Sequence, residues 1–85
     1  MNIELRFFAG VRVALNTAAE SINLPDHIKT IGEVREFLAA RGGAWQEALG
    51  PDKIVRMAYD YKMTGPDTRV TEGCEVAFFP PVTGG

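Results

Sequence analysis

The chain has 85 residues, which is enough for one domain with a modest core. Its composition, 46% hydrophobic and 24% charged, is typical of a soluble globular protein and argues against intrinsic disorder. The net charge is -2 without a basic cluster, so we do not expect nucleic-acid binding, and no apolar run approaches the roughly 20 residues that span a bilayer. A single cysteine and a charged N-terminus indicate a cytoplasmic protein outside any membrane.

The first predicted element is a strand over residues 2–8, because apolar and polar side chains alternate there. The side chains that share the expected buried face are Ile3, Leu5 and Phe7. Phe8 is an aromatic residue on the opposite, polar face, and exposed aromatics are enriched where proteins meet. We expect a loop around Gly10 and then a weaker strand over residues 17–24.

A helix is predicted to begin at Thr30. Thr30 and Glu33 have the spacing of a capping box, in which each side chain bonds the other residue's backbone N–H. Apolar residues follow at helical spacing, namely Ile31, Val34, Phe37 and Leu38. Gly42 and Gly43 favour a left-handed stop, and residues 45–49 could form a short second helix.

Several short strands are predicted after the helices, at residues 54–59, 62–64, 69–70 and 75–79. Phe78 and Phe79 lie on opposite faces of the last one, and we assign Phe78 to the core and Phe79 to an interface. Two strands, a helix and then several strands indicate an α+β domain, which we place at residues 1–79.

Residues 80–85 are predicted to form a flexible, extended tail. Pro80 and Pro81 cannot donate backbone hydrogen bonds, so they end the strand and favour an extended path. Six extended residues reach roughly 20 Å. No side chain after Glu75 is charged, so the carboxylate of Gly85 is the only charge on this arm.

Gly84 and Gly85 lack side chains and can therefore enter a narrow channel. A carboxylate presented in this way is a chemical handle for another protein. ATP would activate it as an acyl-adenylate; attack by sulfide would then give a thiocarboxylate, and attack by an amine would give an amide bond to a target.

The ending Glu-Val-Ala-Phe-Phe-Pro-Pro-Val-Thr-Gly-Gly over residues 75–85, with Phe-Phe-Ala-Gly-Val-Arg over residues 7–12, resembles the small, sulfur-carrying subunits of molybdopterin synthase. The resemblance covers the whole chain. It implies a ubiquitin-like β-grasp fold, in which a mixed sheet wraps one main helix.

The resemblance also implies a function in molybdenum cofactor biosynthesis. An E1-like enzyme would use ATP to adenylate Gly85, and a sulfur donor protein would supply the sulfur of the thiocarboxylate. The chain would then dock onto a large synthase subunit, two of each forming a heterotetramer, and give its sulfur to a pterin precursor. The small subunit itself would bind no metal or cofactor and would not be an enzyme on its own.

The resemblance assigns roles to particular positions. Phe8, Arg12 and Phe79 become partner-surface residues. The inserted arm comprises Val82, Thr83 and Gly84 before the reactive Gly85.

The chain departs from the family pattern at Cys74, where an acidic residue is more usual, and at residues 59–61, where an asparagine is more usual. We interpret Cys74 as an inert packing residue rather than a relay thiol. Three alternatives remain open for the function: a sulfur carrier for thiamine or another product, a ubiquitin-like modifier of lysines, and a plain binding module with an incidental tail.

Overall fold

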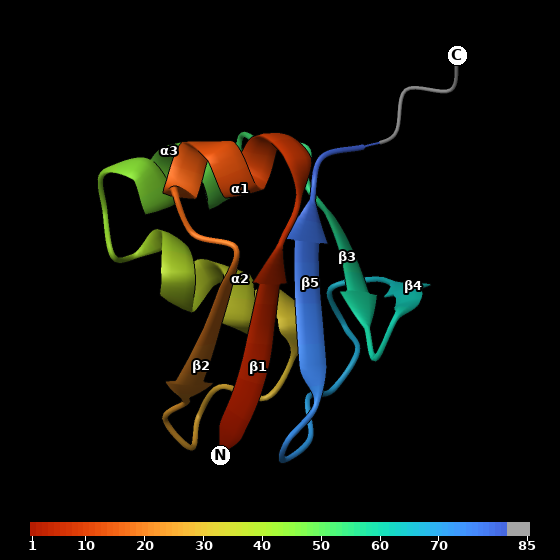
Figure 1. Cartoon of the computed structure of the whole chain (residues 1–85). Coiled ribbons are helices and arrows are strands. Elements are labelled where there is room, and N and C mark those ends of the chain that lie inside the picture. Colours follow the sequence, from red (N-terminus) through yellow and green to blue (C-terminus); the bar gives the residue numbers. More distant parts are fainter. Residues whose placement is uncertain (82–85) are drawn as a thin grey trace.

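The computed structural model describes residues 1–81, and in this range five strands form one mixed sheet in the order β2-β1-β5-β3-β4 (Figure 1). The strands are β1 (Asn2–Phe7), β2 (Ala19–Asn23), β3 (Arg56–Tyr59), β4 (Lys62–Thr64) and β5 (Glu75–Phe79). The central pair, β1 and β5, is parallel, whereas the other three pairs are antiparallel. The first and last strands of the chain therefore lie side by side.

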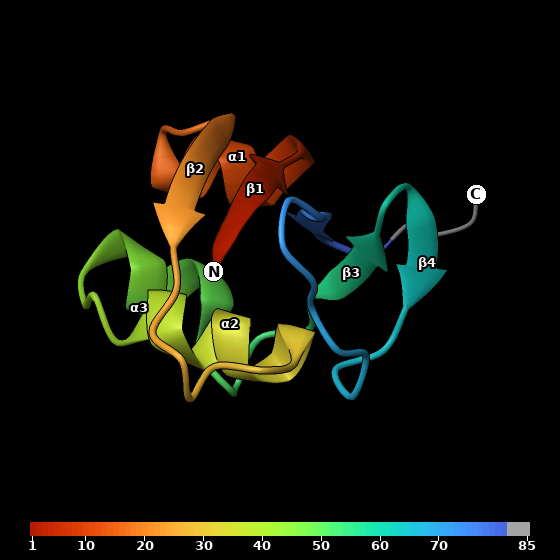
Figure 2. The same ribbon diagram turned by 90° about the horizontal axis from the view of Figure 1, so that it is seen from below.

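The same range contains three helices, α1 (Ala9–Leu15), α2 (Ile31–Ala39) and α3 (Ala44–Leu49). Seen from below, α2 and α3 lie on one side of the sheet (Figure 2), and α1 crosses the upper end of β1 in Figure 1. No helix in residues 1–81 is long and apolar enough to cross a membrane. A mixed sheet packed on one main helix, α2, is the expected β-grasp arrangement, with two short helices added.

The core lies between the sheet and α2. The predicted inward residues of β1 are buried, as is Phe78 of β5, which is 0% exposed. Phe7 stacks on Phe78 and meets Trp45 of α3 edge-to-face at a centroid distance of 5.6 Å. Helix α2 contributes Ile31, Val34 and Leu38. Because each such side chain stabilises the fold by about 1.5–3 kcal/mol when fully buried, this face carries most of the stability.

The capping box at the start of α2 is confirmed. The Glu33 N–H donates to Thr30 Oγ1 at 3.2 Å, and the Thr30 N–H donates to Glu33 Oε1 at 3.0 Å. The Lys29 N–H donates to the same carboxylate oxygen at 2.8 Å, and these backbone bonds lower the pKa of Glu33. Gly42 and Gly43 both have positive φ, which confirms the left-handed backbone after the helix.

The loop predicted around Gly10 is wrong, because these residues begin α1. Val11 and Leu15, four residues apart, are both buried and share one face of the helix. Asn16 then ends α1 in the left-handed conformation. Gly10 lowers intrinsic helix propensity, and the helix forms because packing of its Val11 and Leu15 face outweighs that cost.

The strand predicted at residues 69–70 is also wrong. Arg69 makes only an isolated bridge with Thr30, and the Val70 N–H donates to the Lys29 carbonyl at 2.9 Å. This segment packs against the start of α2, where the Gly32 N–H donates to the Pro66 carbonyl at 2.8 Å. A Cβ on Gly32 would lie 2.9 Å from the Pro66 Cβ, so only glycine permits this approach.

Three other strands differ in their bounds from the prediction, and the first of them, β1, ends at Phe7 rather than at Phe8. Strand β2 covers only Ala19–Asn23 of the expected residues 17–24, and β3 begins at Arg56 rather than at Ile54, which is exposed. Val55, Met57 and Leu24 are nevertheless buried.

Candidate functional site

An apolar groove of about 650 Å³ lies on the face of the sheet away from α2, beside the point where β5 ends. Its lining comprises Phe8, Ala9, Ala58, Tyr61, Met63, Glu75, Ala77, Phe79, Pro80 and Pro81. Ala58 of β3 and Ala77 of β5 are directly paired across the sheet. Because each of these side chains is a single methyl group, the sheet surface is depressed at this pair, and the larger neighbouring side chains surround the depression.

Large exposed side chains form the walls of the groove. Phe8 is 49% exposed and follows β1, where its N–H donates to the Phe78 carbonyl at 3.2 Å. Met63, opposite Ala58 on β4, is 66% exposed, and Phe79 is half-buried. Contiguous exposed apolar surface of this kind is typical of a site that binds another molecule.

The structure brings together two of the three predicted partner residues, Phe8 and Phe79. Arg12 lies instead on α1, exposed beside Val13 and Asn16, in a small separate hollow. The predicted arm residues, Val82, Thr83, Gly84 and Gly85, lie outside the described residues.

Sequence reasoning missed the contributions of the β3–β4 hairpin, Tyr61 and Met63, and of the two alanines beneath them. A usable signal was present in the sequence: Tyr61 precedes and Met63 lies within a three-residue strand that begins with a lysine and is followed by a glycine. Such a strand buries little, so its apolar residues are candidates for contact with another protein.

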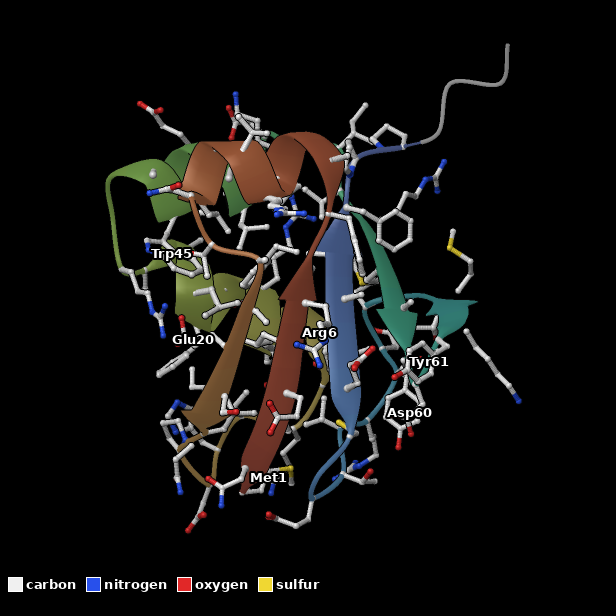
Figure 3. The ribbon with its side chains drawn as sticks, in the orientation of Figure 1. Met1, Arg6, Glu20, Trp45, Asp60 and Tyr61 are labelled. Carbon is white, nitrogen blue, oxygen red and sulfur yellow. The ribbon has the colours of Figure 1, made fainter. Side chains whose placement is uncertain are left out.

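Polar groups lie at the end of the groove remote from the prolines. Glu75 Oε1 accepts a hydrogen bond from Arg6 Nε at 3.2 Å and one from the Tyr61 hydroxyl at 3.3 Å. The Glu75 N–H donates to Asp60 Oδ1 at 2.8 Å. Arg6 and Tyr61 flank β5 from its two sides in Figure 3. An apolar centre with a hydrogen-bonded polar margin is the usual anatomy of a protein–protein interface.

The chain leaves the domain along this groove, since Pro80 and Pro81 both line it. Four residues follow Pro81 in the sequence, and fully extended they span at most about 14 Å.

Cys74 is the thiol that the sequence analysis considered as a possible nucleophile. It is only 4% exposed, and burial raises the pKa of its thiol. A buried, protonated thiol is a poor nucleophile, which supports the interpretation of Cys74 as a packing residue. Residues 1–81 contain no group of three or more histidine, cysteine, aspartate or glutamate side chains that could hold a metal ion.

A second hollow, of about 710 Å³, lies on the helix side between α2 and α3. Its central charged residue is Arg35, which donates hydrogen bonds to the backbone carbonyls of Leu49, Gly50 and Lys53 at 2.6–2.8 Å. The guanidinium is thus occupied in holding the connection from α3 to β3. This hollow is a product of the fold rather than a second candidate site.

A mixed sheet packed on one main helix, with an apolar groove beside the last described residues, is the architecture of a ubiquitin-like β-grasp protein. The model of the ThiS family matches residues 5–85, so nearly the whole chain is covered. The chain belongs to the ThiS family.

Two relatives are each 37% identical over 83 residues, which is 98% of this chain and 99% of theirs. They come from Haemophilus influenzae and Escherichia coli, and both are molybdopterin synthase sulfur carrier subunits. Both alignments therefore compare nearly complete chains.

Solved structures show the same fold. The HVO 2177 protein of Haloferax volcanii superposes with a TM-score of 0.80 at 29% identity, covering 100% of this chain and 87% of that one. SAMP1 from the same organism gives 0.75 at 19% identity, with both chains fully covered. A chain in the complex of subunits 1 and 2 of the molybdopterin-converting factor from Helicobacter pylori gives 0.68 at 23%, again with full coverage of both.

Proposed function

We propose that this chain is a sulfur carrier in molybdopterin biosynthesis and that the carboxylate of Gly85 carries the sulfur. The observation that supports this most is the full-length similarity to two molybdopterin synthase sulfur carrier subunits. The apolar groove beside the last described residues adds a physical reason, because a carrier must dock before its terminus can react. The chain is then a subunit that is not catalytic on its own.

The proposed chemistry proceeds in two steps at the carboxyl group of Gly85. The carboxylate attacks the α-phosphate of ATP, so that an acyl-adenylate forms and pyrophosphate leaves. A sulfur donor protein then supplies sulfur at the oxidation level of sulfide. This sulfur bonds to the carboxyl carbon, the bond from that carbon to the AMP oxygen breaks, and the release of AMP and a proton leaves a thiocarboxylate on Gly85. ATP is bound by the E1-like activating enzyme and not by this chain. The thiocarboxylate is a strong sulfur nucleophile, suited to attack on a pterin precursor inside the large synthase subunit.

Docking onto the large subunit uses the groove, in this proposal. The arm that follows Pro81 spans at most about 14 Å, so the large subunit must contact the sheet surface while Gly85 is in its active site. Phe8 and Phe79 then become buried contacts, and Arg12 lies on the neighbouring helix α1. We propose two copies of each subunit in the assembly.

The alternative functions would form different products at the C-terminal carboxylate. A carrier for thiamine or another product would also form a thiocarboxylate but would not supply sulfur to a pterin precursor. A modifier would form amide bonds to lysines. SAMP1, whose solved structure has the same fold, is described as a small archaeal modifier protein. The higher identity of the two sulfur carrier subunits favours the carrier.

Intact-mass analysis tests the proposal directly. The chain is incubated with its activating enzyme, ATP and a sulfur source, and we expect a mass gain that matches replacement of one oxygen by sulfur, located at Gly85. The loaded chain should then convert a pterin precursor when the large subunit is added. Conjugates of higher mass without thiocarboxylate would identify a modifier, and thiocarboxylate without transfer to the pterin would point to another pathway.

Deletion of Gly85 provides the matched control. It should abolish sulfur loading and leave the thermal unfolding midpoint unchanged, because every core residue in the described chain lies at or before Phe78. If the deletion lowered the midpoint by several degrees, the terminus would have a structural role and the proposal would lose its basis.

A further inference from the structure

The turn between β3 and β4 places an aromatic residue where the backbone disfavours one. Asp60 and Tyr61 are the two central residues of this hairpin turn, and their φ angles are 44° and 71°. A two-residue hairpin turn with positive φ at both positions prefers asparagine or aspartate followed by glycine. Asp60 fits this preference, whereas a bulky side chain at the second position is strained.

Packing within the chain does not compensate for this strain. Tyr61 is 85% exposed, and no large hydrophobic side chain in residues 1–81 is more exposed. Its hydroxyl donates one long hydrogen bond, 3.3 Å, to Glu75, which already accepts from Arg6. Asp60 differs, because its carboxylate accepts a 2.8 Å hydrogen bond from the Glu75 N–H and so has a role in the fold.

We propose that Tyr61 is a principal contact for the large synthase subunit, so this inference rests on the proposed function. Tyr61 lines the apolar groove, and its hydroxyl reaches the Arg6–Glu75 ion pair. Figure 3 shows Arg6 and Tyr61 on the two sides of β5. Tyrosine suits such a position, because its ring can be buried while its hydroxyl keeps a polar partner. Docking would cover the ring and shield the bond from its hydroxyl to Glu75.

The path of the chain indicates which partner occupies the groove. Pro80 and Pro81 line the same groove as Tyr61, and the four residues beyond them reach at most about 14 Å. The subunit that receives Gly85 is therefore held against this surface. A second copy of this chain could also cover an apolar groove, and the experiment below separates the two.

The test is the substitution Tyr61→Gly, measured for stability and for binding. Glycine accepts positive φ without strain, so we expect the midpoint of thermal unfolding to rise by about 2–6 °C. Binding to the large subunit, measured by calorimetry, should weaken by about tenfold or more, since buried tyrosines are frequent binding hot spots. Tyr61→Phe keeps the ring and should bind within about threefold of the original chain.

Two control variants match the two halves of the test. Ile54→Ser removes an apolar side chain that is 75% exposed and lies outside the groove, and it should leave the affinity unchanged. Asn16→Gly relieves a positive φ of 51° at the end of α1, far from the hairpin, and should not weaken binding either.

Opposite changes in stability and affinity support the anchor role of Tyr61. Unchanged affinity for Tyr61→Gly, with sulfur transfer by the unsubstituted chain intact, would overturn this inference and leave the proposed function standing. A fall in the unfolding midpoint would also overturn it, because Tyr61 would then stabilise the fold. A dimer of the free chain that Tyr61→Gly dissociates, with unchanged affinity for the large subunit, would identify a self-interface instead. If the unsubstituted chain neither binds the large subunit nor gains sulfur, both proposals fail.

Discussion

The two faces of the central sheet contain the same kinds of residue and use them differently. Phe7 and Phe78 point to α2 and are at most 1% exposed, whereas their immediate neighbours Phe8 and Phe79 point the other way and line the groove. The alternation of a strand places consecutive phenylalanines on opposite faces. The difference lies in what covers each face: helices cover the first, and no element within residues 1–81 covers the groove.

This division separates stability from recognition. The inner face supplies the hydrophobic free energy that folds the domain, and the outer face can change with little effect on folding. In the proposed function the outer face is the docking surface, and it can fit a partner without cost to the core. The following predictions test that separation, beginning with the largest expected effect.

Phe78→Ala should have the largest effect on stability. Removing a fully buried phenyl ring leaves a cavity between β5 and α2, and such substitutions cost about 3–5 kcal/mol. Because the free energy of unfolding of a small domain is about 5–15 kcal/mol, this substitution should remove a large part of it. Urea unfolding followed by circular dichroism measures this. A loss below about 1 kcal/mol would show that the inner face does not carry the fold.

Phe79→Asp is the matched substitution on the outer face. A carboxylate placed in the groove must lose its hydration when the large subunit docks, so we expect the affinity to fall by about 10- to 100-fold, which is about 1.4–2.8 kcal/mol. The loss of unfolding free energy should be smaller than for Phe78→Ala, because Phe79 is only half-buried. Calorimetric titration and urea unfolding together check both halves, and an unaltered affinity would remove Phe79 from the interface.

The smallest predicted effect concerns the polar edge of the inner face. Arg41 donates two hydrogen bonds to Glu20 of β2, at 2.6 and 3.0 Å, and its guanidinium lies 4.3 Å from the centre of the Trp45 ring (Figure 3 shows Glu20 and Trp45). The ion pair lowers the pKa of Glu20 below its ordinary 4.5. Glu20→Gln should therefore cost about 0.5–1 kcal/mol at neutral pH.

The pH dependence of this difference has a definite sign. Because the folded-state pKa of Glu20 is lowered, the stabilisation is complete above pH 4.5, the ordinary value, and is lost as the pH falls through the folded-state pKa. The unfolding midpoints of the original chain and of Glu20→Gln should differ at pH 7 and converge in acid. A difference that persists to pH 2 would mean that the Glu20 charge is not its source.

The sequence alone determined the elements with strong local signals. The alternation of Ile3, Leu5 and Phe7 predicted β1 and its buried face, and the Thr30–Glu33 capping box predicted the start of α2. It also placed Phe8 and Phe79 outside the core. These features depend on the period of a strand or on bonds between residues three positions apart, and such interactions are visible in a short window.

The tertiary structure decided what depends on distant residues. Helix α1 forms because Val11 and Leu15 find a core to pack against, although Gly10 and the unremarkable local propensities indicated a loop. The docking groove exists because the register of β3 against β5 places Ala58 opposite Ala77, nineteen positions later in the chain. Register is set by the packing of the whole sheet, so the hollow that these two alanines create, and the position of Tyr61 beside it, appear only in the folded molecule.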